Sequence, residues 1–125
     1  MTGFVFDAGA LIAFERNDRT VVMLVKRLLE LRAKVIIPAG VVGQVWRDGG
    51  RQARLARLLG SPVATIETLD DRRARAAGQL CGLTGTRDVI DASVVLSARQ
   101  HEIPVATSDP GDLRKLDIKV RLVAV

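Results

Sequence analysis

Short apolar segments alternate with longer amphipathic ones along almost the whole chain, and this alternation limits the possible folds more than any other feature. The apolar segments predict strands at 3–6, 35–37, 63–66, 104–107 and 120–125. Apolar residues at helical spacing between them predict helices at 10–14, 19–31, 41–46, 51–59, 70–83, 88–100 and from 109 onward. Strands interleaved with helices form a parallel sheet that helices cover on both faces. We therefore expect a single α/β domain over residues 1–125, with about four or five parallel strands.

The composition excludes several kinds of site. Hydrophobic residues make up 48% of the 125 residues, which is enough for a core, but aromatic residues only 3%. A platform of stacked aromatic rings for single-stranded nucleic acid is therefore excluded. The one cysteine, Cys81, and the one histidine, His101, exclude an internal disulfide and an ordinary structural zinc site. We expect Cys81 to be a small buried hydrophobe and His101 to lie at a helix end.

The apolar runs of the sequence also indicate where in the cell the protein is expected. No apolar run reaches the roughly 18 residues of a membrane helix. Asp7 interrupts the apolar segment near the N-terminus and no cationic segment precedes it, so we expect no signal peptide. We expect a cytoplasmic protein without a membrane contact.

The charge balance points to a polyanionic partner. Nineteen Lys and Arg residues against fourteen Asp and Glu residues give a net charge of +5. For a small domain this suggests nucleic acid. Arginines scattered over a solvated surface would give the same charge, so the balance alone does not decide.

Three aspartates occupy positions where a parallel sheet binds ligands. Asp7 follows the first strand and Asp109 follows the strand at 104–107, and ligands gather at these carboxyl ends. Asp91 lies on the apolar stripe of its helix, where an unpaired carboxylate costs several kcal/mol. Each aspartate has a simpler interpretation: Asp7 and Asp109 as helix caps, and Asp91 as the partner of Arg87 beside a capping Asp88. If the three converge instead, a divalent cation offsets their repulsion, and oxygen ligands favour Mg²⁺ or Mn²⁺.

Four segments carry a resemblance to a known family. They are Phe4–Ile12, Ile37–Ala39 leading to Val45–Arg47, Asp88–Ser93, and Val105–Asp109. In this order and at these spacings the sequence resembles the PIN-domain family, particularly its VapC-type ribonuclease toxins. The resemblance covers essentially the whole chain and implies a Rossmann-like parallel sheet. It also implies an acidic cluster that binds Mg²⁺ or Mn²⁺ and hydrolyses RNA.

The resemblance assigns roles to individual residues. The acids of the family match Asp7, Asp91 and Asp109 as metal ligands, and Asp88 matches an additional acid of some members. The second acid of the family, a glutamate, falls on Gln44, which keeps a carbonyl oxygen but brings no charge. This departure puts the metal affinity and the catalytic competence in doubt. Family members are commonly bound by a small antitoxin and often form homodimers.

These observations predict a metal-dependent endoribonuclease, the toxin of a bacterial type II toxin–antitoxin pair. Asp7, Asp91, Asp109 and Gln44 would form the catalytic site, with Asp88 assisting the metal. Substrate guidance is assigned to the side chains of Arg47, Arg51, Arg54, Arg57 and Ser108. The alternative is a catalytically weakened PIN-like module that binds RNA or a protein, with Gln44 marking the lost activity.

Two other classes of protein fit less well. A haloacid-dehalogenase-type phosphatase also begins with a strand that ends in Asp, but Gly9 occupies the place of its second Asp. A nucleotide-binding Rossmann protein needs a glycine-rich loop after the first strand, and none is present there.

Overall fold

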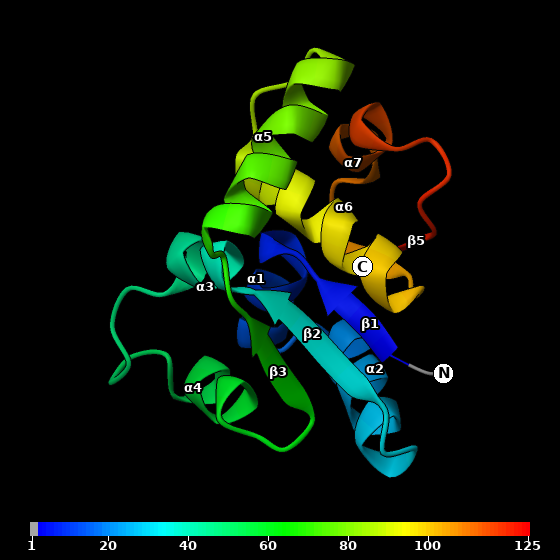
Figure 1. Cartoon of the computed structure of the whole chain (residues 1–125). Helices are drawn as coiled ribbons and strands as arrows, with labels where there is room; N and C mark the ends of the chain where they lie inside the picture. The colour runs from blue at the N-terminus through cyan, green and yellow to red at the C-terminus, as the bar shows by residue number, and fades with distance from the viewer. Residues whose placement is uncertain (1–2) are drawn as a thin grey trace.

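A five-stranded sheet with helices on both faces forms the protein (Figure 1). The computed structural model describes residues 3–125. The strand order is β3-β2-β1-β4-β5, and each neighbouring pair is parallel, which confirms the expected fold class. The strands are β1 (Gly3–Phe6), β2 (Lys34–Pro38), β3 (Ala64–Glu67), β4 (Val105–Thr107) and β5 (Leu122–Ala124). The helices are α1 (Ala8–Glu15), α2 (Arg19–Glu30), α3 (Ala39–Val45), α4 (Ala53–Leu59), α5 (Asp71–Thr84), α6 (Val89–His101) and α7 (Pro110–Leu116).

The two faces of the sheet are covered by different helices. Helix α6 packs across β1, β2 and β4 on one face, and α5 packs on α6 (Figure 1). Helices α1, α2 and α4 cover the other face. Because both faces are covered, the central strands are continuously apolar: Val5, Phe6, Val35 and Ile37 are fully buried. The core is mainly aliphatic, as the low aromatic content requires.

The direction of the strand order reverses beside β1. From β1 the chain adds β2 and β3 on one side, and it then crosses back to add β4 and β5 on the other. Open α/β sheets bind ligands at such a reversal, outside the carboxyl ends of the two strands that flank it. Here those strands are β1, which is followed by Asp7, and β4, which is followed by Ser108 and Asp109.

Aspartates begin several of the helices. The Asp7 carboxylate accepts the Ala10 N–H at 2.9 Å, and Asp88 accepts the N–H groups of Ile90 and Asp91 at 3.0 and 2.9 Å. Each such cap satisfies backbone donors that have no partner within the helix. The capping interpretation of Asp7 and Asp88 is therefore confirmed, but it does not exclude a second role. None of the helices within residues 3–125 combines the length and the apolar character needed to cross a membrane.

Candidate active site

Asp7 is the most buried of the aspartates at the carboxyl edge of the sheet. Its side chain is almost inaccessible, since the residue is only 7% exposed. Burial raises the pKa of Asp7, and the nearby charge of Asp109 raises it further. Hydrogen bonds from the Thr107 hydroxyl and from the N–H groups of Ala10 and Gly9 partly offset these effects. A buried carboxylate with few compensating charges favours either a proton or a cation.

Among the carboxyl groups at this edge of the sheet, Asp91 has the most strongly shifted pKa. It lies in the first turn of α6 and is partly buried, as its place on the apolar stripe predicts. Burial, followed by the negative charges of Asp88, Asp7 and Asp112, raises the pKa of Asp91 to about 7. The charges of Asp88 and Asp7 act on Asp91 because α6 begins at the carboxyl edge of β1.

Asp109 completes the set that the sequence predicted. It precedes α7 at the N-cap position, but its side chain makes no capping hydrogen bond. Its backbone N–H donates to the Thr107 hydroxyl at 2.9 Å, and the same hydroxyl lowers the pKa of Asp7. Thr107 therefore connects the two acidic positions, and the carboxylate of Asp109 is exposed. The capping interpretation of Asp109 is not supported.

The negative charge of this cluster is not neutralised by basic side chains. None of the ion pairs among residues 3–125 includes Asp7, Asp88, Asp91 or Asp109. The alternative pairing of Asp91 with Arg87 is therefore not observed. Unpaired carboxylates that raise the pKa of one another are typical of functional sites.

The cluster has suitable ligand chemistry for a hard divalent cation, but the carboxylates are not already gathered around one point. Within residues 3–125 no three His, Cys, Asp or Glu side chains stand close enough together to hold an ion. Hard cations prefer carboxylate oxygens, so the donors fit Mg²⁺ or Mn²⁺.

Asp112 is a further acid at this edge that the sequence reasoning missed. It lies in the first turn of α7, three residues after Asp109, and its charge raises the pKa of Asp91. Its carboxylate also lies 3.5 Å from the Lys115 ammonium group, and both side chains are largely exposed. The available signal was the Asp-Pro-Gly-Asp segment, which places two acids at the start of one helix.

The other predicted site residues lie in different surroundings. Gln44, on α3, is exposed, and no hydrogen bond within residues 3–125 involves its side chain. The Arg47 guanidinium donates to the carbonyls of Gly43 and Trp46, at 3.1 and 2.7 Å, and so caps the end of α3. Arg51 is exposed beside Asp48, and Arg54 binds Asn17.

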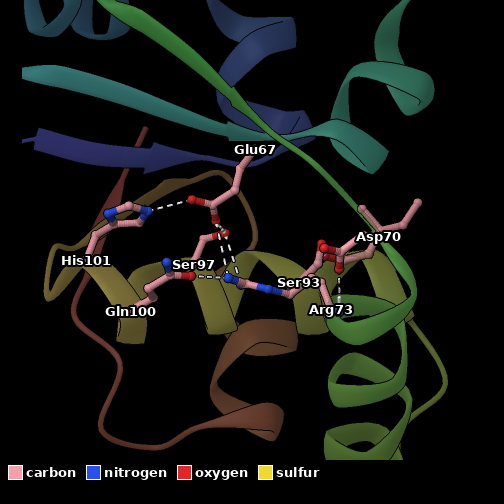
Figure 2. Close-up of polar contacts among 8 residues, drawn as sticks. Glu67, Asp70, Arg73, Ser93, Ser97, Gln100 and His101 are labelled. Carbon is pink, nitrogen blue, oxygen red and sulfur yellow. Dashed lines mark hydrogen bonds and ion pairs between the residues drawn. The ribbon is translucent and has the colours of Figure 1, made fainter.

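A second polar cluster lies where β3 meets α5 and α6. Figure 2 shows Glu67 between Ser97 and His101, with Arg73 reaching across from α5. The His101 ring Nε2 lies 2.5 Å from a Glu67 carboxylate oxygen, and Arg73 also binds Gln100. Each of these polar groups has a hydrogen-bond or ion-pair partner within the cluster. Because the partners come from β3, α5 and α6, the cluster joins these three elements. His101 does lie at a helix end, and Cys81 is buried, as expected.

Comparison with known proteins identifies the family. A model of the PIN domain matches residues 4–119. The chain belongs to the PIN domain family. The acidic cluster of this PIN domain lies within the matched segment. A search of curated protein sequences found no match.

Solved structures share the fold of this PIN domain at low sequence identity. VapBC2 from Rickettsia felis, bound to a DNA fragment from its promoter, is 12% identical with a TM-score of 0.71, and 99% of each chain is covered. FitAcB from Neisseria gonorrhoeae is 22% identical with a TM-score of 0.63, and 95% of each chain is covered. VapC20 from Mycobacterium tuberculosis, a toxin that cleaves the sarcin-ricin loop, is 18% identical with a TM-score of 0.57. This match covers 86% of our chain and 88% of the other.

Proposed function

We propose that this PIN domain is a divalent-metal-dependent endoribonuclease and the toxin of a type II toxin–antitoxin pair. The observation that carries the proposal is the cluster of Asp7, Asp91 and Asp109 at the reversal of the strand order. These acids come from three distant segments, they form no ion pair with a basic side chain among residues 3–125, and the pKa values of Asp7 and Asp91 are raised. Membership of the PIN family and the fold shared with VapC20 support the same activity.

In this proposal Asp7, Asp91 and Asp109 hold Mg²⁺ or Mn²⁺, and Asp88 assists through a water. When bound, such an ion would lower the pKa of a water and neutralise charge on the scissile phosphate. Burial and the charges of Asp88, Asp7 and Asp112 raise the pKa of Asp91 to about 7, so this carboxyl group would give up its proton on holding a cation. The Thr107 hydroxyl accepts the backbone N–H of Asp109 at 2.9 Å and lowers the pKa of Asp7, so we assign it a supporting role beside these two acids. Gln44 is assigned as a neutral ligand or as a group that positions water.

The proposed substrate is RNA, guided to the acidic cluster by the basic surface. Arg47, Arg51, Arg54 and Ser108 remain our candidates for contact with phosphates. Arg51 is the most available of the three arginines, since it is exposed and its distance of 3.8 Å from Asp48 indicates a weak pair.

Cleavage of labelled structured RNA tests the activity. We expect cleavage with Mn²⁺ or Mg²⁺, none with a chelator, and none by Asp7→Asn or Asp91→Asn. Asp18→Asn is the matched control, because Asp18 is an exposed cap of α2 and Asn caps a helix equally well. Cleavage that persists with chelator, or in Asp7→Asn, would overturn the metal-dependent mechanism.

The second candidate is a PIN-like module that binds RNA or a protein without cleaving it. Two observations favour this candidate: Gln44 is exposed, and the part of the chain that the structure describes, residues 3–125, contains no assembled set of metal ligands. Titration with Mn²⁺ separates the two: retained RNA affinity without measurable Mn²⁺ binding would support the binder. Gln44→Glu should tighten Mn²⁺ binding if this side chain faces the cluster, and unchanged affinity would remove Gln44 from the site.

We also propose an antitoxin partner and a homodimer. Membership of the PIN family and the fold shared with VapC20, which is named as a toxin, support such a partner here. Expression of the chain alone should arrest bacterial growth, and Asp7→Asn should restore it. Relief by coexpression of a small protein encoded beside this chain would identify the antitoxin, and light scattering of the purified protein would test the dimer.

A further inference from the structure

Gly9 and Ser108 make an unusually close contact between the two segments that carry Asp7 and Asp109. A Cβ atom added to Gly9 would stand 1.9 Å from the Ser108 Oγ, 2.9 Å from its Cβ and 3.3 Å from its backbone nitrogen. Real Cβ atoms essentially never approach another heavy atom within 3 Å, so an alanine at position 9 requires a displacement. Rotation of the serine hydroxyl relieves only the shortest of the three contacts. The other two contacts are with the Cβ atom and the backbone nitrogen of Ser108, which this rotation does not move.

This contact sits between the acids of the candidate site. Gly9 follows Asp7 by two residues in the first turn of α1, and its backbone N–H lowers the pKa of Asp7. Ser108 directly precedes Asp109, whose backbone N–H donates to the Thr107 hydroxyl at 2.9 Å. The loop between β4 and α7 thus approaches the start of α1 at Ser108.

We propose that Gly9 is a positioning residue for the metal site. The absence of its side chain lets Ser108 seat on α1, and this seating sets the separation of the Asp7 and Asp109 carboxylates. Mg²⁺ demands near-ideal octahedral geometry, so a displaced loop weakens its binding. This inference rests on the proposed metal site, and it gives Ser108 a steric role in place of, or beside, contact with phosphate.

The test measures Mn²⁺ affinity by calorimetry for Gly9→Ala, Ser108→Gly and the double variant. We expect Gly9→Ala to weaken binding by about 10- to 100-fold, as substitutions that displace metal ligands typically do. The double variant should recover most of the affinity, because it removes the Ser108 atoms at 1.9 and 2.9 Å. Ser108→Gly alone should change the affinity much less than Gly9→Ala. Gly78→Ala is the matched control, since it lies within α5 and nothing lies within 4 Å of its added Cβ.

Two readouts keep this inference separate from folding and from the proposed function. Thermal unfolding in chelator shows whether Gly9→Ala folds; if it does not, Ser108→Val crowds the same contact from the other side and should weaken Mn²⁺ binding. Metal-free crystals of wild type and variant report the distance between the Asp7 and Asp109 carboxylate carbons, which we expect to increase. An unchanged distance, or a double variant as weak as Gly9→Ala, overturns the positioning role. A wild type that binds no Mn²⁺ overturns the proposed function, and the distance still decides the positioning role.

Discussion

At the scale of single residues, Asp91 shows a conflict between stability and function. Its carboxyl group lies on the apolar stripe of α6 and has the charges of Asp88, Asp7 and Asp112 nearby. A residue chosen for stability alone would be uncharged at this position, because burial and repulsion both oppose ionisation. Sites that bind metals often carry such a cost, which the bound ion removes.

Asp91→Asn should therefore stabilise the metal-free protein. The pKa of Asp91 is about 7 in the folded state and 3.8 as the reference for the unfolded state. The destabilisation by its charge is absent below the unfolded value, grows as pH rises, and is fully present above pH 7. Because the side chain is partly exposed, we expect a gain of about 1–2 kcal/mol at pH 8. Urea denaturation in chelator at pH 5 and pH 8 measures it.

Asp18→Asn provides the comparison for this measurement, since it replaces an exposed capping carboxylate by an equivalent cap. Its stability should follow that of the wild type at both pH values. An Asp91→Asn protein no more stable than wild type at pH 8 would show that the carboxyl group is not strained by its neighbours.

At the scale of elements, the sequence predicts the fold more completely than the site. Apolar periodicity is a local signal, so the strands and helices are found close to their predicted bounds. The place of Asp91 on the apolar stripe is local too, and the sequence revealed it. Gly9 and Ser108 are different, because their contact depends on the pairing of β1 with β4, which the periodicity of neither segment records. Asp112 was missed because α7 has only seven residues, too few to show which side faces α6.

The cluster around Glu67 also escaped prediction, since it joins β3, α5 and α6. Burial opposes the ionisation of Glu67, but hydrogen bonds from His101 and Ser97 and the charge of Arg73 outweigh it and hold the pKa of Glu67 below its usual range. Its contribution to stability is thus present above about pH 4.5 and is lost as pH falls through the lower folded-state pKa. The cluster therefore holds α6, the helix that carries Asp91, against α5 and β3.

Glu67→Gln should weaken the contacts of this cluster. We expect a loss of about 1–2 kcal/mol at pH 7, because the amide keeps one acceptor but lacks the charge that pairs with Arg73. The difference from wild type should shrink as pH falls through the lowered folded-state pKa of Glu67, where Glu67 itself gains a proton. Chemical denaturation at pH 7 and pH 3.5 checks both parts. A constant difference at the two pH values would contradict the electrostatic explanation.

The connection between α3 and α4 depends on one buried amide. The Gln52 side chain accepts the N–H groups of Arg47 and Asp48, at 2.7 and 2.9 Å, and donates to the Val45 carbonyl at 2.9 Å and to Glu15 on α1 at 3.2 Å. This amide holds the end of α3, the helix that carries Gln44, against α1.

Gln52→Ala should cost about 2 kcal/mol, because it leaves several backbone groups without partners and water can reach only part of them. Thermal or urea unfolding measures the loss, and Arg51→Ala, at an exposed neighbouring position, should change stability by less than about 0.5 kcal/mol. Equal effects of the two substitutions would show that solvent replaces the amide completely.

At the scale of the whole molecule, the charges have two tasks: the attraction of RNA and the binding of a divalent cation. The chain carries a net charge of +5, yet the edge between β1 and β4 gathers unpaired aspartates. A uniform positive surface would bind RNA but could not collect a divalent cation, and a uniform negative one would repel RNA. The net positive charge of the chain favours binding of RNA, and the acids near the reversal of the strand order favour binding of a cation.

RNA binding without metal should therefore depend strongly on salt. Each phosphate that a basic side chain neutralises on a single strand contributes about 0.7 to the slope of log affinity against log salt. Arg51→Gln should reduce this slope by about that amount if Arg51 contacts a phosphate, and it should leave the fold intact because the side chain is exposed. Lys26→Gln, on the exposed side of α2, is the comparison for net charge alone. Filter binding in chelator from low to high salt measures the slopes. Identical slopes for the two variants would mean that Arg51 acts only through the total charge, and RNA guidance would then have to be assigned to other residues.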